Sequence, residues 1–498
     1  MAPNQLGILE QGEWEDVQVK SDWKPDWKPA MPTRLRRLSP GRVKSWFWPR
    51  STGCGSQQLR PTAWLDGLRG FAAFLVYWQH HELWAHDYDT ENPIFENAFG
   101  YNKKFYLVSF PGIRLLFTGG HFAVAIFFVI SGYVLSAKPL KLIHDGEFLK
   151  LGDNVASALF RRWFRLYLPI ICTTLVYCTM WHAFGIWVSN ATAKGSWREE
   201  VWAWYAEFKN FSFVFNSGGL PWFSYNVHLW SIPLEMKGSI VVYTVALAIS
   251  RCTRNARLWV MSGLIFYFLY ITDAYYCALF VAGMLLGELD LLAKKDELPR
   301  FLARLEPAKE FICWHLFAVG IYLAGVPNQN DNLDQLRKNR GWYYLSFLKP
   351  QAVFDYKWFY LFWAAIFVIT ATPRIRWVKP FFETRFCQYL GRISYALYLV
   401  HGPVLSTLGE RLYMAAGWLE WRAKEYLPGW HNKFPLPRVG PMGLELAFLL
   451  PHLVLLPLTF WVAEMVTRFV DEPSVRFPAW LYRKATGAEK QPQLAVKE

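Results

Sequence analysis

The chain has 498 residues and a formal net charge of +14, and it is long enough for several soluble domains. However, 53% of its residues are hydrophobic, 18% are aromatic and only 18% are charged, which favours a polytopic membrane protein over a soluble one. The basic residues lie in short segments between apolar runs and form no stripe with stacking aromatic residues, so nucleic acid is not an expected partner. The partner that this composition predicts is the lipid bilayer.

Both ends of the chain are polar. Residues 1–62 contain the near-repeat Asp22-Trp-Lys-Pro and Asp26-Trp-Lys-Pro, then a basic run, and predict a disordered cytosolic tail. They lack the short apolar core of a cleavable signal peptide, so the first internal helix is expected to direct membrane insertion. Residues 63–475 are predicted to form one transmembrane domain, and residues 476–498 a second cytosolic tail.

Between these ends, about ten apolar runs are long enough, or nearly long enough, to cross a bilayer as helices. The expected fold is therefore an all-α polytopic membrane protein with about ten transmembrane helices. The runs cover residues 64–82, 119–137, 163–188, 236–250, 257–273, 275–292, 311–326, 356–371, 389–408 and 444–469.

The distribution of charge predicts how these helices are oriented. With a cytosolic N-terminus, every second connection is rich in Lys and Arg, as the positive-inside rule requires, and an even number of spans returns the C-terminus to the cytosol. The sequons at Asn190 and Asn210 then fall in one lumenal loop, and both asparagines are candidate glycosylation sites of a glycoprotein. Such sequons favour the endoplasmic reticulum or the plasma membrane as the location.

The first apolar run carries Asp66, Arg69, His80 and His81. Ionisable side chains inside a bilayer are costly, so they are expected to face a cavity or a partner and to be functional. Arg69 and His80 are eleven residues apart, nearly a whole number of helical turns, so they share one helix face about 16 Å apart along the axis. His81 points away from that face and is the weaker candidate.

Further polar or aromatic segments follow Arg69 and His80 in order. They are Phe127–Tyr133, Arg161–Arg162 with Arg165 and Pro169, Trp230–Glu235, Leu390–His401, and Glu472-Pro473. Together with an arginine followed by ten residues and a histidine, this series resembles the membrane-bound acyltransferase 3 family, as a fungal-type member, over about residues 62–475. The resemblance implies an O-acyltransferase that moves an acyl group, usually acetyl, from acyl-CoA to a hydroxyl, with His80 as the catalytic histidine.

The predicted topology sorts the candidate site residues into two layers. A cluster of arginines and hydroxyls near the cytosolic surface suits the phosphates of coenzyme A, because guanidinium groups bind phosphate oxygens bidentately. A second layer, toward the lumen, contains imidazoles and one carboxylate. The donor-side residues are Arg69, Ser131, Tyr133, Arg161, Arg162, Arg165 and Arg392; the lumenal ones are His80, His121, Glu235 and His401.

Neutral His80 is expected to act as the general base, because the unperturbed pKa of histidine lies near the operating pH. Arg69 is expected to assist donor binding, and Glu235 to orient an imidazole or bind the acceptor. His121, Trp230 and His401 are predicted to line the path of the acceptor, a carbohydrate or a lipophilic secondary metabolite. Acyl-CoA is expected as a co-substrate, and no permanently bound cofactor is predicted.

Two alternatives remain open. Ten helices with buried charge also suit a transporter or flippase, although no internal repeat is visible. A receptor or scaffold that has lost the chemistry is the second alternative, with Arg69 as an interfacial anchor and Gly67 and Gly70 serving only helix packing. A zinc enzyme is not expected, because the histidines and the seven cysteines lack metal-ligand spacing and no His-Glu-x-x-His motif occurs, so no metal site is predicted.

Overall fold

The computed structural model describes residues 59–86, 98–100, 103, 105–216, 221–327, 332–418 and 427–487. Within these residues all regular structure is helical and no strand occurs, which confirms the predicted all-α class. The predicted N-terminal tail lies outside the described residues except for its last four positions. Part of the predicted C-terminal tail belongs to helix α19 (Glu472–Thr486), and residues 488–498 lie outside the described part.

Each of the ten apolar runs forms a helix. Among the residues that the structure describes, five helical segments are long and apolar enough to cross a membrane, judged by length and composition: Gly120–His144, Phe148–Phe184, Val227–Ala248, Tyr275–Lys294 and Leu446–Thr486. The count of ten spans and the orientation of the termini stay predictions. The helices of the ten runs are α2 (Ala63–His86), α4 (Gly120–His144), α5 (Phe148–Phe184), α7 (Ser231–Ala248), α8 (Arg254–Phe266), α9 (Tyr275–Lys294), α11 (Lys309–Ala324), α13 (Tyr356–Ala371), α15 (Arg385–Val404) and α18 (Leu446–Val466).

Shorter elements connect or extend these helices. The amphipathic helix α6 (Trp197–Phe211) starts at a capping box, in which Ser196 and Glu199 each bond the other's backbone N–H. Helical turns η5 (Tyr267–Ile271), η9 (Leu405–Gly409) and η10 (Thr467–Asp471) are π-helical and prolong α8, α15 and α18. The remaining elements are α3 (Arg114–Thr118), α10 (Arg300–Ala303), α12 (Leu333–Lys338), α14 (Val378–Phe382), α16 (Glu410–Ala416), η3 (Leu107–Ser109), η4 (Val227–Trp230), η6 (Glu306–Ala308), η7 (Leu345–Leu348) and η8 (Thr372–Arg374).

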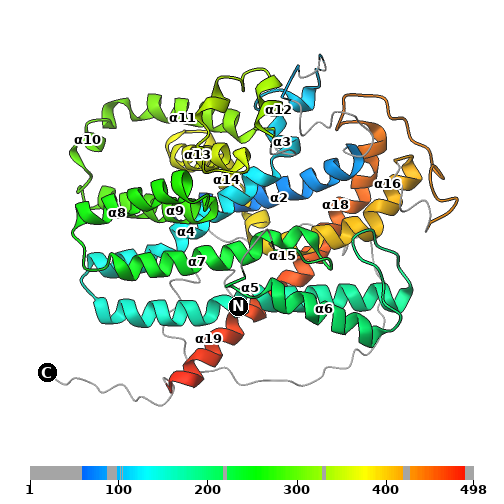
Figure 1. Ribbon diagram of the computed structural model, residues 1–498, viewed down its shortest axis with the longest axis horizontal. Coiled ribbons are helices and arrows are strands. Elements are labelled where there is room, and N and C mark those ends of the chain that lie inside the picture. Colours follow the sequence, from blue (N-terminus) through cyan, green and yellow to red (C-terminus); the bar gives the residue numbers. More distant parts are fainter. Residues whose placement is uncertain are drawn as a thin grey trace, which may run out of the picture.

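Helices α2, α4 and α15 form the centre of the molecule (Figure 1). Helix α2 packs on α15 and on α4, α4 packs on α7 and α9, and α15 packs on α18. On one side of this centre α11 packs on α13, and on the other α5 packs on α7 and α19. The helices that carry the predicted catalytic His80 and the predicted acceptor-path histidines His121 and His401 therefore all belong to this centre.

Close contact between α2 and α15 depends on glycine. A Cβ atom on Gly70 would overlap the backbone nitrogen of Gly391 in α15, and one on Gly67 would overlap the carbonyl oxygen of Phe382, the last residue of α14. The absence of side chains lets the two backbones touch, as small residues do at membrane helix interfaces. The packing role considered for Gly67 and Gly70 is confirmed: Gly70 lies on the face of α2 that is turned toward α15, and Gly67 lies against the end of α14.

We expect Gly70→Leu to lower the free energy of unfolding by about 1–3 kcal/mol or more, because the new side chain forces α2 and α15 apart. Gly152→Leu is the matched control, since Gly152 lies in α5 with no atom near its would-be Cβ. Thermal unfolding of both variants in detergent checks this. Equal melting temperatures for the two would contradict the packing role.

Candidate active site

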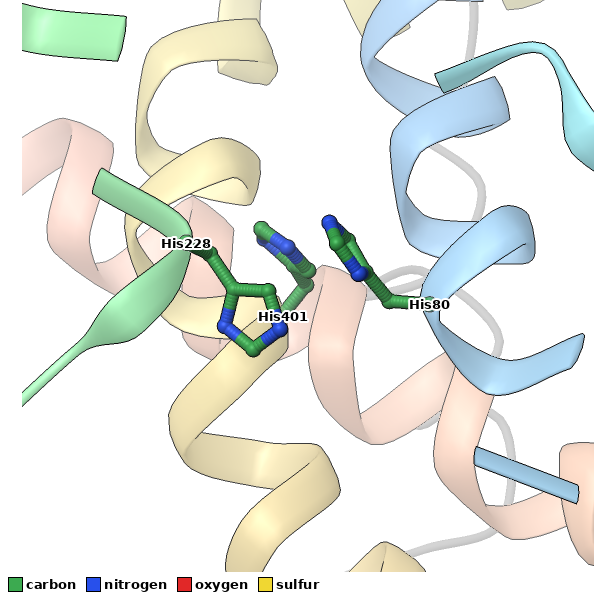
Figure 2. Close-up of side chains that lie close together, drawn as sticks. All are labelled: His80, His228 and His401. Carbon is green, nitrogen blue, oxygen red and sulfur yellow. The ribbon is translucent and has the colours of Figure 1, made fainter. Parts of the chain in front are cut away.

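Three histidines from separate elements meet at the centre of the bundle (Figure 2). His80 comes from α2, His228 from the turn η4 that leads into α7, and His401 from α15. The ring centroid of His80 lies 4.1 Å from that of His228 and 5.2 Å from that of His401, and the last two are 4.9 Å apart. Each ring offers a nitrogen within 4.8 Å of the others, so one small group can contact all three.

The orientation of His401 is fixed by its own helix. Its Nδ1 lies 3.2 Å from the carbonyl oxygen of Leu397, one turn earlier, and as the donor in this bond it carries the proton. Nε2 is then left with its lone pair, and it is buried without a hydrogen-bond partner among the described residues. An imidazole held in this tautomer is prepared to accept a proton or to bind a ligand.

The position of His228 is fixed by neighbours on α15. Tyr398 donates a hydrogen bond to the backbone oxygen of His228, and the Tyr398 hydroxyl also lies 2.8 Å from the Ser231 hydroxyl. Asn226 donates from Nδ2 to the carbonyl oxygen of Leu399 at 2.9 Å, which attaches the same turn to α15. Gly402 leaves the space that the His228 ring occupies, because a Cβ there would overlap His228 Nδ1.

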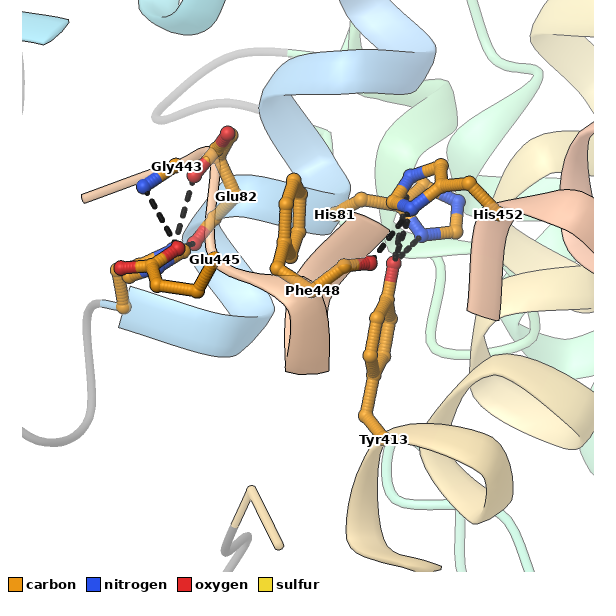
Figure 3. Close-up of polar contacts among 8 residues, drawn as sticks. His81, Glu82, Tyr413, Gly443, Glu445, Phe448 and His452 are labelled. Atoms are coloured by element: carbon orange, nitrogen blue, oxygen red, sulfur yellow. Dashed lines mark hydrogen bonds and ion pairs between the residues drawn. The ribbon is translucent and has the colours of Figure 1, made fainter. Parts of the chain in front are cut away.

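Sequence reasoning placed His80 and His401 in one layer but missed His228. His228 lies in a short turn, where no helical period marks a face, although it is only two residues before the predicted Trp230. The structure confirms that His81 points away. Its Nδ1 lies 2.7 Å from the Tyr413 hydroxyl, in a separate group with His452 (Figure 3).

Beside His228 lies a small cavity that is partly open to the outside. Asn226 is 4% exposed, and its Oδ1 has no hydrogen-bond partner in the described part of the chain. Burial, the hydrogen bond to Glu200 and the charge of that carboxylate raise the pKa of the Tyr225 phenol, so it remains a donor. The cavity is lined by Tyr177, Trp181, Asn190, Ser224, Tyr225, Asn226, His228, Gly402, Pro403 and Ser406.

The other predicted acceptor-path residues lie near the histidines. The rings of His121 and Trp230 are 6.4 Å apart, and Trp358, which sequence reasoning did not single out, packs against both. His121 Nδ1 is buried and has no hydrogen-bond partner among the described residues. These three side chains form one aromatic cluster that joins α4, α13 and η4.

The predicted glycosylation candidates differ in their surroundings. Asn190 borders the cavity and donates from Nδ2 to the Ser406 hydroxyl at 3.1 Å. Asn210 lies exposed in the last turn of α6. Glycosylation of either residue stays a prediction.

Arg69 is attached to the start of α15. Its Nε donates to the Ser394 hydroxyl at 3.1 Å, and its Nη2 donates to the Gly391 carbonyl at 2.9 Å and lies 3.2 Å from Asp66. The Nη1 group takes part in none of these contacts. Arg69 therefore anchors α2 to α15 and keeps one nitrogen that these contacts do not use.

Glu235 bonds to the donor-side residues. Arg162 Nη2 and the Ser131 hydroxyl both donate to its Oε1 at 2.5 Å, and Arg162 Nε donates to Ser239 at 2.8 Å. Both charged side chains of this ion pair are about nine-tenths buried, 10% and 12% exposed. Glu235 thus bonds the donor-side residues and lies seven residues, about two helical turns, after His228 in the chain; its expected role in orienting an imidazole or binding the acceptor stays a prediction.

The remaining donor-side residues also lie near acidic groups. Tyr133 donates to Asp290 at 2.8 Å, Arg392 forms an ion pair with Glu464, and Arg165 interacts electrostatically with buried Asp471. Arg161 donates from Nε to the Ser157 carbonyl at 3.1 Å. The expected basic cluster is thus a network of guanidinium and carboxylate groups.

The structure corrects the predicted layers at Glu235, which was expected beside the lumenal imidazoles but bonds Arg162 and Ser131 of the donor side. His80 on α2, His121 on α4, His228 before α7 and His401 on α15 each lie seven to eleven residues from a polar-layer residue of the same helix, namely Arg69, Ser131, Glu235 and Ser394. At 1.5 Å per residue the levels are roughly 10–16 Å apart. In α2 and α15 the polar residue precedes the histidine along the chain, whereas in α4 and before α7 the histidine comes first. Helices that run in opposite directions therefore place their histidines at one level and their polar residues at the other.

Proton-accepting side chains held inside a bundle of long apolar helices are typical of a membrane-embedded enzyme. The sequence profile of the acyltransferase domain family known as acyltransferase 3 matches residues 62–461, and the chain belongs to this family. It is an O-acyltransferase enzyme, which removes the reason to prefer a transporter or a scaffold.

Curated relatives agree with this membership. An O-acetyltransferase, PaAT-1 of Phomopsis amygdali, is 30% identical over 472 residues, which cover 88% of this chain and 87% of that protein. Acyltransferase clz18 of Cochliobolus lunatus is 21% identical and acyltransferase R4 of Phoma sp. is 22% identical, each over 85% of this chain and 96% of the relative. No solved structure matches the chain.

Proposed function

We propose that the protein transfers an acetyl group from acetyl-CoA to a hydroxyl of a lipophilic metabolite or a carbohydrate, with His80 as the general base. The observation that carries the proposal is the convergence of His80, His228 and His401 at one point inside the bundle. The name of the Phomopsis relative, an O-acetyltransferase, supports acetyl as the acyl group.

His80 is proposed as the base because it is half-buried and lies on the face of α2 that also carries Arg69. The acceptor oxygen attacks the thioester carbonyl carbon while an imidazole nitrogen of His80 takes the hydroxyl proton. The tetrahedral intermediate collapses, the carbon–sulfur bond breaks, and His80 returns the proton to the thiolate of coenzyme A. His401 Nε2 and His228 lie close enough to hold the acceptor oxygen during this step.

The donor is proposed to enter from the side of the arginine network. Arg69 and Arg162 each use Nε and Nη2 in protein contacts, so Nη1 of each is the group proposed to meet the donor phosphates. The carboxylates of Asp66 and Glu235 hold these guanidinium groups in place. An extended pantetheine arm then runs along α2 toward His80.

The acceptor is proposed to approach from the cavity beside His228. Its lining offers hydroxyls, amides and aromatic rings, which suit a hydroxylated molecule with an apolar skeleton. Localisation to the endoplasmic reticulum or the plasma membrane is part of the proposal, with the cavity on the lumenal side.

The test uses the full chain purified in detergent, labelled acetyl-CoA and longer acyl-CoAs, and a panel of sugars and hydroxylated terpenoid and polyketide acceptors. We expect label transfer from acetyl-CoA to at least one acceptor. Absence of binding to every acyl-CoA would contradict the donor, and transfer only from a longer acyl-CoA would contradict acetyl.

We expect Asn226→Ala to raise the KM for the acceptor by about 2–10-fold, because its unpaired Oδ1 is positioned to accept a hydrogen bond from the acceptor, and to lower kcat as well, because Nδ2 attaches the His228 turn to α15. Asn255→Ala is the control, as Asn255 is exposed at the start of α8. Steady-state kinetics with varied acceptor checks this. An unchanged KM in a folded variant would remove Asn226 from the acceptor site.

A further inference from the structure

The three-histidine cluster has the composition of a metal site. His80, His228 and His401 each offer one ring nitrogen, and these nitrogens lie within 4.8 Å of one another (Figure 2). Three histidines with an open fourth position are a known ligand set for Zn²⁺, at Zn–N distances of about 2.0–2.1 Å. Such bonds place ligand nitrogens roughly 3.3 Å apart, so each imidazole has to move inward by less than about 1 Å.

The protonation pattern of the cluster fits a metal. A ligating histidine usually donates its second ring N–H to a carbonyl or a carboxylate, which fixes the tautomer and the ring direction. His401 is 1% exposed and has this arrangement, with Nδ1 at 3.2 Å from the Leu397 carbonyl and Nε2 buried without a partner in the described residues.

The supporting contacts hold the second ligand in place as well. The backbone of His228 is bonded by Tyr398, and its turn is attached to α15 through Asn226. His80 and His228 are only half-buried, so an ion has access to the cluster. Neutral imidazoles favour zinc, copper or nickel over magnesium or calcium, which prefer oxygen ligands.

We infer that the cluster binds one divalent transition-metal ion of the zinc type, and that this ion inhibits acyl transfer. The ion occupies the lone pair that His80 needs to accept the hydroxyl proton, so the metal-bound form cannot perform the general-base step. The binding part of the inference stands on the cluster alone, while the inhibition part rests on the proposed function.

The experiment uses the full chain carrying a histidine-free affinity tag, purified in detergent and stripped with EDTA, which is then removed. Zn²⁺ is titrated calorimetrically into wild type, His228→Ala, His401→Ala and His315→Ala, and Co²⁺ serves as a spectroscopic probe of coordination geometry. His315 is the control because it is exposed on α11. Size-exclusion elution and thermal unfolding verify that each variant is folded, and His228, in a half-buried turn, is the variant expected to tolerate substitution best.

We expect one Zn²⁺ per wild-type chain and a tetrahedral Co²⁺ spectrum. Both cluster variants should lose affinity by about 10–100-fold or more, since loss of a supporting contact alone has that effect, whereas His315→Ala should bind as wild type does. Mg²⁺ should not compete. Equal Zn²⁺ affinity in wild type and folded His228→Ala would overturn the site.

Activity separates the inference from the proposed function. Metal-free wild type should transfer label, Zn²⁺ should abolish the transfer, and EDTA should restore it. Transfer that is unchanged or raised by bound Zn²⁺ would overturn the inhibition. If metal-free wild type transfers no label from any acyl-CoA, the proposed function fails, while the calorimetric result still decides whether the metal site exists.

Discussion

We expect His80→Ala to lower kcat for acyl transfer by about 10²–10⁴-fold, with little change in donor affinity. The half-buried His80 ring contacts His228 and His401 at the centre of the bundle, so its removal takes away the proposed base without breaking an ion pair. Single-turnover transfer of labelled acetyl from acetyl-CoA measures the chemical step, and calorimetric titration with coenzyme A measures donor binding.

The control for this variant is His315→Ala, because His315 lies exposed on α11 and bonds only the carbonyl of its own helix at Phe311 among the contacts described. Its activity should equal that of wild type. The decisive comparison is with His401→Ala, whose Nε2 also has a free lone pair. If kcat falls more in His401→Ala than in His80→Ala, then His401 is the general base, and the assignment of that role to His80 is wrong.

Much of the fold follows from local sequence pattern. The apolar run at 356–371 is helix α13 (Tyr356–Ala371), which starts after the side-chain cap Asp355 and ends before Pro373. Helix α5 shows where the pattern fails, since it begins at Phe148 although apolar residues become dense only near residue 163. Charged side chains on its first turns hide that part of the helix from a search for apolar runs.

The site was predictable only where helical period decides the geometry. Arg69 and His80 share a face of one helix, so their placement follows from spacing along α2. His228 joins them through the packing of η4 against α15, which no spacing along the chain encodes. The absence of a metal site was predicted from spacing along the chain, whereas the fold brings together histidines 148 and 173 residues apart.

The ion pairs, too, could be predicted from the sequence only where both partners lie on one helix. Arg69 and Asp66 are three residues apart on one helix and could be paired from sequence, whereas Arg162 with Glu235 and Arg392 with Glu464 join distant helices. From the sequence, the arginine cluster was predicted to be a phosphate-binding site in which the arginines have no acidic partners. The structure places the carboxylates of Glu235 and Glu464 among these arginines. The charge available to a donor is smaller than the number of arginines indicates.

Removing one member of the buried pair between Arg162 and Glu235 should destabilise the protein strongly. We expect Glu235→Ala to lower the free energy of unfolding by about 3–5 kcal/mol, because the guanidinium of Arg162 stays buried without its carboxylate and Ser131 loses its acceptor. Thermal unfolding and SDS titration of the detergent-solubilised protein measure this. Glu306→Ala is the control, since its pair with Lys309 is exposed and should contribute less than about 1 kcal/mol.

Replacing both members by apolar residues separates stability from donor binding. In Arg162→Met with Glu235→Leu no buried charge is left unpaired, and such exchanges are often neutral, so most of the lost stability should return. Donor affinity should not return, because Arg162 Nη1 is one of the two groups proposed to meet the phosphates. Wild-type affinity for coenzyme A in the folded double variant would show that this pair only joins α5 to α7, and the phosphates would then have to bind elsewhere on the donor side.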